Sequence, residues 1–367
     1  MNFVKIISLL CISITACSAC KKEQNSSAIQ NPVPASKVAL VAGSATVSGI
    51  SDHANPLDAR FQRLGKITWD HRNNSLYILD AASTSHLRKL DQAGITTIAN
   101  AAFGVFNEGY DICLAPDGAG YIYVTTSMGQ LMKVNTTVPL NAGNPSILID
   151  WIRADGSQKT DGNAIGSLDD AAISGPHGLA AVPGGKLYFS NSHYLTIHQV
   201  DFSETGNEVS FFAGKPTTGV SAPAFPFADG AGITATFGGI NDMVSDNLGN
   251  VYVADHEYGT VRKISPDGTV STYLTPTPNT HTYYDDLDGT LSTARAGSVK
   301  HVGVKQDGSV IFFATPRTLR AIIPSRNSVV TIAKFNDTIN GIAVTPDGKE
   351  VYVACNYGIY KVTDMPL

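Results

Sequence analysis

The chain has 367 residues, among them 34 glycines and 18 prolines, and only 16% of the residues are charged. No stretch keeps a 3.6-residue hydrophobic period, a pattern that favours many strands joined by tight turns. The formal net charge of −5, with no cluster of Lys or Arg, argues against a nucleic-acid partner.

The first residues are typical of a secretory signal. Lys5 gives a short positive start, and residues 6–14 form an apolar core much shorter than the roughly 20 residues that span a bilayer. The sequence ITAC at 14–17 resembles a bacterial lipobox, which implies cleavage before Cys17 and lipidation of its thiol. Cys20 is a second candidate, and a plain signal peptide with incidental cysteines is the alternative.

These features divide the chain into three parts. Residues 1–16 are the signal peptide, 17–36 are the lipidated cysteine with a polar, flexible tether, and 37–367 are one folded domain. Within the domain, Cys113 and Cys355 lie in strand-like runs and show no metal or redox spacing, so we expect both to be small buried side chains.

A four-strand unit recurs along the domain. Its clearest copy, at 238–274, has the runs GGINDMVSD, NVYVADH, TVRKISP and TVSTYL, separated by turns of Gly, Asn and Asp. An apolar run, the first strand of the unit, precedes each copy of the second strand, and further strand-like runs follow it. The second strand occurs in six copies, so the domain has six units. The copies of that strand are LYILD (76–80), YIYVTT (121–126), LYFSN (187–191), VYVAD (251–255), IFFAT (311–315) and VYVAC (351–355).

The last unit supplies only three strands. Residues 38–43, VALVAG, match the fourth strand VSFFAG of another unit but have no strands before them. Pairing this segment with the last unit would close a ring and remove an exposed edge. We therefore predict an all-β, six-bladed β-propeller in which the N-terminal strand completes the C-terminal blade.

The segments that lead into the units share a second pattern. In the fourth unit Asp229-Gly230 is followed by Phe237, and the strands then read VYVAD and VRKI. This pattern resembles the NHL-repeat family of β-propellers, and the resemblance covers 38–364. Three features depart from the family pattern: residues 257–260 replace its Asn-His-Arg, the second unit lacks the lead-in, and the fifth reads FFAT in place of YVAD.

The fold implies where a ligand would bind. In a propeller the first strands line a central channel, and the segments from a fourth strand to the next first strand open on one face. The long insertions, 151–174, 215–238 and 276–296, are all of this kind. Because loops on a rigid scaffold carry function, we expect the binding site on this face.

By register, pairs of residues enter the first strands at the mouth of this channel: Gly65-Lys66, Tyr110-Asp111, His177-Gly178, Asn241-Asp242, Lys300-His301 and Asn340-Gly341. Second strands end on the same face, among them at Asp80, Asn191 and Asp255. The candidate ligand-binding residues are Tyr110, Asp111, His177, Asn191, Asn241, Asp242, Asp255, His301 and Asn340.

Three alternatives accompany these candidates. The channel residues could form a solvated lining without a ligand. Asp80 and Asp255 could instead cap N–H groups of neighbouring turns. Aromatic residues of the insertions could bind a carbohydrate or protein, or could pack the insertions onto the blades; they are Trp151, Phe225, Phe227, Tyr283 and Tyr284.

We expect a monomeric binding or scaffold module with a protein or carbohydrate ligand, lipid-anchored to a membrane of the bacterial cell envelope, and no cofactor. We expect this membrane to be the outer membrane, with the folded domain in the periplasm or exposed on the cell surface. The alternative is a metal-dependent hydrolase or lactonase similar to gluconolactonase-like propellers, which would hold Ca²⁺ or another divalent metal in the channel. Its ligands would come from Glu108, Asn191, Asn241 and Asp255. No catalytic residue is predicted, because no GxSxG, HExxH, P-loop or dinucleotide motif is present.

Overall fold

The structure is a computed structural model. It divides into two units, Met1–Val33 and Pro34–Leu367. The described residues all belong to the second unit, so the predicted signal peptide, Cys17 and nearly all of the tether lie outside them. None of the described residues forms a helix long and apolar enough to cross a membrane. The described residues are 36–81, 85–100, 109–115, 120–137, 146–150, 152, 154–159, 161–202, 207–216, 227–274 and 286–367.

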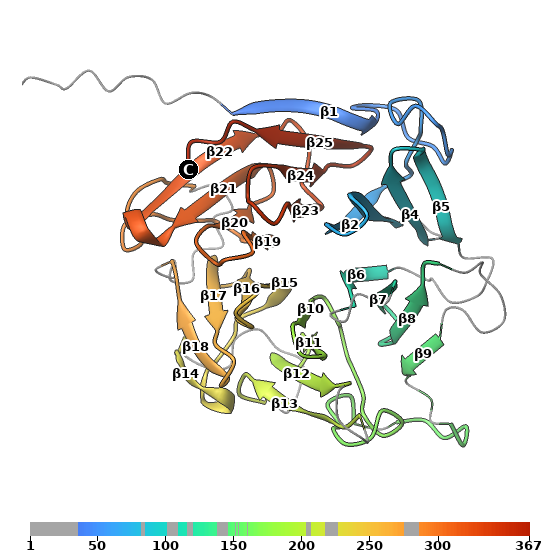
Figure 1. Ribbon diagram of the computed structural model, residues 1–367. Helices are drawn as coiled ribbons and strands as arrows, with labels where there is room; N and C mark the ends of the chain where they lie inside the picture. Colours follow the sequence, from blue (N-terminus) through green and yellow to red (C-terminus); the bar gives the residue numbers. More distant parts are fainter. Residues whose placement is uncertain are drawn as a thin grey trace, which may run out of the picture. The chain divides into compact units, whose positions relative to one another are not determined.

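Six antiparallel sheets follow one another around a central axis, which confirms the six-bladed β-propeller (Figure 1). Blades 1, 2 and 3 consist of β2–β5, β6–β9 and β10–β13. Blades 4 and 5 consist of β14–β18 and β19–β22, and blade 6 consists of β23–β25 together with β1. Within the described ranges, the helical segments are two single turns, η2 (Gly232–Thr234) and η3 (Pro324–Arg326).

The strands have the following bounds. The innermost strands are β2 (Leu64–Asp70), β6 (Gly109–Leu114), β10 (Leu179–Val182), β15 (Ile240–Ser245), β19 (His301–Val304) and β23 (Gly341–Val344). The second strands are β3 (Ser75–Ala81), β7 (Tyr121–Thr126), β11 (Lys186–Asn191), β16 (Val251–Asp255), β20 (Ile311–Ala314) and β24 (Val351–Ala354). The third strands are β4 (Ser85–Asp91), β8 (Leu131–Asn135), β12 (Thr196–Asp201), β17 (Thr260–Ile264), β21 (Thr318–Ile323) and β25 (Gly358–Thr363). The outer strands are β5 (Gly94–Asn100), β9 (Ser146–Ile149), β13 (Val209–Ala213), β18 (Thr269–Thr272), β22 (Ser328–Lys334) and β1 (Lys37–Gly43), and the short β14 (Gly230–Ala231) pairs with β18.

The position of a strand in its blade explains its sequence. All five residues of β16, VYVAD, are buried, because neighbouring strands and blades cover both of its faces. The outer strand β18, TVST, buries only Val270 fully and leaves its neighbours Thr269 and Ser271 exposed. Continuous apolar runs therefore mark inner strands, and alternating runs mark strands with one solvated face.

The N-terminal strand closes the ring as predicted. β1 pairs antiparallel with β25, from Lys37 opposite Thr363 to Gly43 opposite Gly358, with a bulge between Leu40 and Ala42. The strand order of blade 6 is β1-β25-β24-β23, so the outer edge of β25 is covered.

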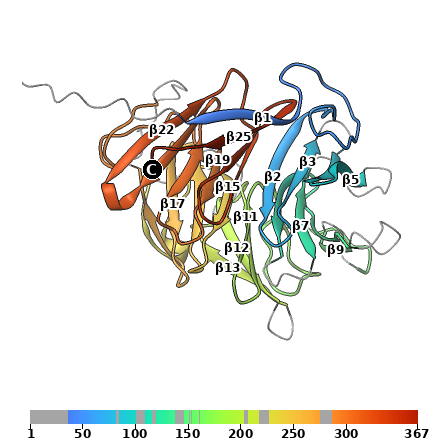
Figure 2. The ribbon, with the colours of Figure 1, turned by 45° about the horizontal axis from the view of Figure 1, so that its top comes forward.

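The innermost strands contact one another in sequence around the axis, and β2 contacts both β6 and β23 (Figure 1). Blades 1 and 4 therefore lie on opposite sides of the channel. In the turned view of Figure 2 the outer strands β5, β9 and β22 lie at the margin of the ring. We call the face on which the innermost strands begin the mouth face, and the face of the first-to-second-strand turns, such as 345–350, the opposite face.

The lead-in pattern has a structural role in blade 4. Arg262 on β17 is fully buried and donates to Asp229 at 2.7 Å and to Asp255 at 3.4 Å. Its guanidinium also lies 4.3 Å from the ring centroid of Phe227, which packs against Tyr258. The lead-in Asp therefore fastens the incoming segment to its blade, and Phe227 packs the insertion rather than standing free.

The same clamp recurs with different residues. In blade 1, Arg88 donates to Asp52 and Asp80, and in blade 5, Arg320 donates to Asp288. Blade 3 has a neutral version, in which His198 Nε2 lies 3.1 Å from Asn163 Oδ1. Four of the lead-in segments are thus held by buried polar contacts.

Large parts of the insertions, 217–226 and 275–285 with Trp151, lie outside the described residues, so the predicted wall around the mouth stays a prediction.

Candidate functional site

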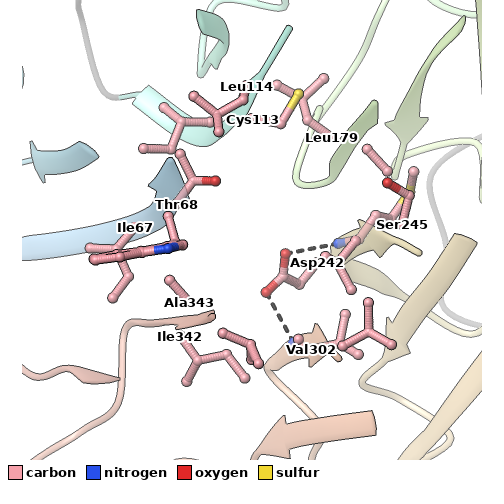
Figure 3. Close-up of a pocket in the computed structure, with 18 of the residues that line it drawn as sticks. Ile67, Thr68, Cys113, Leu114, Leu179, Asp242, Ser245, Val302, Ile342 and Ala343 are labelled. Atoms are coloured by element: carbon pink, nitrogen blue, oxygen red, sulfur yellow. Dashed lines mark hydrogen bonds between the residues drawn. The ribbon is translucent and has the colours of Figure 1, made fainter. Parts of the chain in front are cut away.

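The axis of the propeller contains a cavity of about 200 Å³ lined by all six innermost strands. Figure 3 shows side chains from each of these strands around a common space, from Ile67 and Leu179 to Ile342. Most of the lining residues are apolar, and the charged groups gather where the strands begin, at the mouth end.

Four buried polar residues form the lower tier of the mouth: Lys66, Asp111, Asp242 and His301. Lys66 Nζ lies 2.5 Å from Asp242 Oδ2, and this ion pair joins blades 1 and 4 across the channel. His301 Nδ1 lies 3.4 Å from the same oxygen. Apart from the ion pair, the Lys66 ammonium has no hydrogen-bond partner among the described residues.

Asp242 also joins neighbouring blades through the backbone. Its Oδ2 accepts from Val302 N of blade 5 at 3.1 Å, and its Oδ1 accepts from Met243 N at 2.8 Å (Figure 3). Burial raises the pKa of Asp242, but the Lys66 ammonium and His301 outweigh burial and hold this pKa below its ordinary value. Asp242 is therefore a carboxylate at neutral pH.

Asp111 occupies the equivalent position in blade 2. Its Oδ2 accepts from Leu179 N of blade 3 at 2.7 Å, and its Oδ1 accepts from Ile112 N at 2.8 Å. Burial raises the pKa of Asp111 to about 8; Lys66 opposes this shift and Asp242 adds to it. The pKa values of these two equivalent carboxyl groups are thus shifted in opposite directions, and the ion pair with Lys66 is the contact that Asp242 has in addition.

Five half-buried residues form the upper tier, nearer the solvent: Tyr110, His177, Asn241, Lys300 and Asn340. The rings of Tyr110 and His177 are stacked with centroids 4.4 Å apart. Asn241 donates to Lys300 O at 2.6 Å, and Asn340 donates to Asn356 Oδ1 at 3.1 Å.

A cleft of about 420 Å³ opens on the mouth face between blades 3 and 4. Three histidines line it, and Gly238 and Gly239 form part of its wall. A Cβ on Gly239 would lie 2.3 Å from the His256 ring, so any larger residue there would displace this ring. Its polar lining residues are His177, Ser192, His193, Asn241, His256 and Glu257.

The structure brings most of the predicted site residues together. Tyr110, Asp111, His177, Asn241, Asp242, His301 and Asn340 all lie at the mouth, in the two tiers. Their role as ligand-binding residues stays a prediction.

Asn191 and Asp255 do not lie open at the mouth. Both are fully buried within their blades. Asp255 Oδ1 accepts from Gly238 N at 3.0 Å and Gly239 N at 2.9 Å, and Asn191 Oδ1 accepts from Ser174 N at 2.9 Å. The capping alternative thus describes the contacts of Asp255 and of Asp80, which accepts from Gln62 N and Arg63 N. It was not predicted for Asn191, which makes the same kind of contact.

The predicted metal ligands do not fit a divalent cation. Asp255 already faces two backbone N–H groups and the Arg262 guanidinium, and Asn191 donates its amide to Gly162 O at 2.8 Å. A cation would have to displace all of these contacts. Glu108 lies outside the described residues, and among those described no group of three His, Cys, Asp or Glu side chains is arranged to hold a metal.

Sequence reasoning placed Lys66 and Lys300 at the mouth by register but did not select them as site residues. The register of the first strands could have identified them, because Lys66 and Lys300 stand at positions equivalent to the candidate site residues of other blades. The pairing of Lys66 with a blade on the other side of the ring had no local signal.

Comparisons with known proteins support the fold. No protein-family model matches the chain, and no curated protein matches its sequence. Among solved structures, a protein of unknown function from Bacteroides thetaiotaomicron is similar, with 17% identity over 90% of this chain and 76% of that chain and a TM-score of 0.63. An auxiliary nutrient binding protein from the same organism has 15% identity over 89% of this chain and 76% of that chain, with a TM-score of 0.62.

A putative gluconolactonase is also similar, with 10% identity over 90% of this chain and 93% of that chain and a TM-score of 0.52. At such identities the likeness shows the fold alone, and that fold is the β-propeller. The assignment to the NHL repeat and the lipoprotein form remain predictions.

Proposed function

We propose that this protein is an envelope lipoprotein that binds a protein or carbohydrate ligand on the mouth face of its propeller. The observation that carries this proposal is the 420 Å³ cleft, which has the size of a small-ligand site and a largely apolar lining that also presents several polar side chains. The similarity in fold to an auxiliary nutrient binding protein is compatible with it.

Part of the cleft lining is available to a ligand. Asn241 Oδ1 and the ring nitrogens of His177 have no hydrogen-bond partner among the described contacts, whereas Asn241 Nδ2 is fixed by Lys300 O and the His177 backbone by Ser190 Oγ. A fixed amide and a stacked ring lose little side-chain entropy when a ligand binds. These groups suit a polar ligand such as a sugar.

The experiment measures binding of the full-length lipoprotein in detergent to an array of neutral and acidic glycans. Asn241→Ala and His193→Ala should weaken any interaction at the cleft, and Lys349→Gln on the opposite face should leave it unchanged. Binding that only Lys349→Gln weakens would refute the proposed face.

A protein ligand calls for a loop deletion instead. Removing 276–292 would also remove Asp286 and Asp288, which contact the buried Arg320, and so would damage blade 5. Deletion of 276–285 keeps this clamp and tests the insertion alone. A co-purifying envelope protein that stays bound after this deletion would show that the insertion is not its site.

The lipid anchor rests on the ITAC sequence before Cys17. Wild-type protein should take up labelled fatty acid and enter the membrane fraction, and Cys17→Ser should do neither. Continued labelling of Cys17→Ser would refute the assignment, and Cys20→Ser is the matched control.

The second candidate is a metal-dependent hydrolase, which rests on the similarity in fold to a putative gluconolactonase. Because Asn191 and Asp255 are held by the lead-in segments, such an enzyme would need other ligands. Calcium or zinc that stays with the protein through dialysis, together with lactone hydrolysis, would favour this candidate.

A further inference from the structure

The axial cavity is separate from the cleft of the mouth face. It is lined by all six innermost strands and has a volume of about 200 Å³, whereas the cleft is lined by residues of blades 3 and 4. Among the described residues, the two have no lining residue in common. At its mouth end the axial cavity reaches Lys66 and Asp242, whose ion pair of 2.5 Å crosses the channel. A ligand in the cleft would therefore not occupy the axial cavity.

The axial cavity continues instead toward the opposite face. A cavity of about 290 Å³ lies there beside the first-to-second-strand turns of blades 1, 3 and 4, and we call it the vestibule. Five residues line both the vestibule and the axial cavity: His71, Leu114, Ala181, Ser245 and Gln306. The two cavities are therefore contiguous, and the axial cavity is reached through the vestibule.

Backbone hydrogen bonds fix part of the rim of the vestibule. Asn247 N donates to Gln306 O at 2.9 Å, and Gln306 N donates to Pro346 O at 3.1 Å. These bonds join the turns of blades 4, 5 and 6, so Gln306 is held at the junction of the two cavities. A site whose walls are already fixed loses little conformational entropy when a ligand binds.

The axial cavity is apolar along its length and polar at its inner end. Figure 3 shows Ile67, Val302 and Ile342 on different sides of the common space. At the inner end the side chain of Lys66 is only 9% exposed, and its ammonium has three N–H groups but one described acceptor, Asp242. A buried donor without an acceptor costs free energy, so a ligand that supplies an acceptor at this position is favoured.

The dimensions and charges of the cavity limit the ligand. Its lining on β2 runs from Lys66 to Trp69, a length of roughly 10 Å at about 3.3 Å per residue. Because an apolar cavity of roughly 150 Å³ holds benzene, this one suits a molecule of about six to eight heavy atoms. Lys66 and Asp242 neutralise each other, and Asp111 lies in the same tier. An anionic head would therefore face two carboxyl groups, and a neutral acceptor avoids this repulsion.

We propose that the axial cavity is a second binding site, entered from the opposite face, for a small uncharged molecule with an apolar body and a carbonyl or hydroxyl oxygen that accepts from Lys66. The oxygen takes an N–H group that Asp242 leaves free, and the body lies along the innermost strands. Apolar walls with a few polar groups that fix orientation are typical of small-molecule sites. This site is independent of the ligand proposed for the mouth face.

The test is NMR spectroscopy of the full-length protein with isotope-labelled methionine methyl groups, titrated with hexanamide. Met243 lines the axial cavity, whereas Met132 is packed in the core between blades 1 and 2. The Met243 resonance should therefore shift and the Met132 resonance should not. Hexylammonium has the same apolar body but no acceptor, so it should shift neither. This comparison uses the wild-type protein and does not depend on the folding of a variant.

Two variants test the position of the ligand and its route. Thr68→Phe places a ring in the cavity and should weaken hexanamide binding roughly tenfold or more. Thr269→Phe, the same change at an exposed position of β18, should leave binding unchanged. Gln306→Trp narrows the junction with the vestibule and should slow the exchange of hexanamide, measured from the line width of Met243. Thermal melts confirm that these variants fold.

Four outcomes would overturn the inference. Equal shifts of Met132 and Met243, or equal binding of hexylammonium, would show partitioning into apolar regions without recognition by Lys66. An unshifted Met243 at saturating hexanamide would show that the cavity takes no such ligand. Hexanoate that binds more tightly than hexanamide would refute the uncharged head, and unaltered exchange in Gln306→Trp would refute entry through the vestibule. Each of these results leaves the mouth-face proposal standing, because the cleft is a separate cavity.

Discussion

Single buried residues give this propeller its pH response. The pKa of Asp111 is raised from its ordinary 3.8 to about 8, so between these pH values the carboxyl group is protonated in the folded state and ionised in the unfolded state. The stability that this proton contributes is present at low pH and is lost as the pH rises from about 4 through 8.

The first prediction concerns this proton. Asp111→Asn keeps an oxygen for Leu179 N and removes the titration. Relative to wild type, the variant should gain stability as the pH rises from 5 to 9, measured by urea unfolding. A constant difference between the two proteins over this range would contradict the raised pKa.

His198 acts in the opposite direction. Burial lowers its pKa to about 4 from 6.5, and Asp161 only partly opposes this. Between about pH 4 and 6.5 His198 is therefore protonated in the unfolded state and neutral in the folded state. The free energy of unfolding decreases as the pH falls through this range. The ring lies between Phe189 and Phe211, which leaves no water to solvate a charge.

The second prediction follows from this burial. His198→Phe should lose some stability at pH 7, because Asn163 loses its partner, but should lose less than wild type on acidification to pH 4.5. The measurement is urea unfolding at both pH values, with the exposed His53→Phe as control. A steeper acid response in His198→Phe would refute the assignment.

At the scale of elements, the lead-in segments are fastened to their blades by buried arginines. Arg262 and Asp255 are both fully buried, whereas Asp229 is 45% exposed in its side chain. Loss of the arginine would leave Asp255 as a buried carboxyl without its cation, while loss of Asp229 would leave Arg262 with its other partners.

The third prediction compares the two sides of this clamp. Arg262→Met should destabilise the protein by about 3–5 kcal/mol, as expected for breaking a buried pair. Asp229→Ala should cost about 1 kcal/mol or less, since solvent screens its half-exposed carboxylate. Equilibrium unfolding in urea gives both values. Equal losses in the two variants would show that Asp255 does not depend on Arg262.

The fold could be predicted from the sequence because its signals are local. Apolar runs and Gly, Asn or Asp turns define the strands, and the unpaired run at 38–43 was enough to predict closure of the ring by β1. Register along the first strands also placed His177, Asn241 and Asp242 correctly at the mouth.

Long-range polar contacts could not be predicted in the same way. Asp255 and Asn191 end their strands on the mouth face, yet each is held by backbone groups of a segment that precedes it by up to 29 residues. Lys66 meets Asp242 only because blades 1 and 4 face each other across the channel. Such partners are set by closure of the whole ring and leave no pattern in nearby residues.

For the whole molecule, the two faces of the propeller differ. The mouth face carries the cleft and the two tiers, and the opposite face carries short turns such as 345–350. We propose that the ligand binds on the mouth face.

Hydrogen–deuterium exchange of the full-length protein, with and without a saturating glycan that binds on the array, tests this location directly. The bound glycan should slow exchange in 192–195, 238–241 and 256–259, which surround the cleft, and not in 246–250, 305–309 and 345–350. Protection confined to the turns of the opposite face, with none at the cleft, would contradict it.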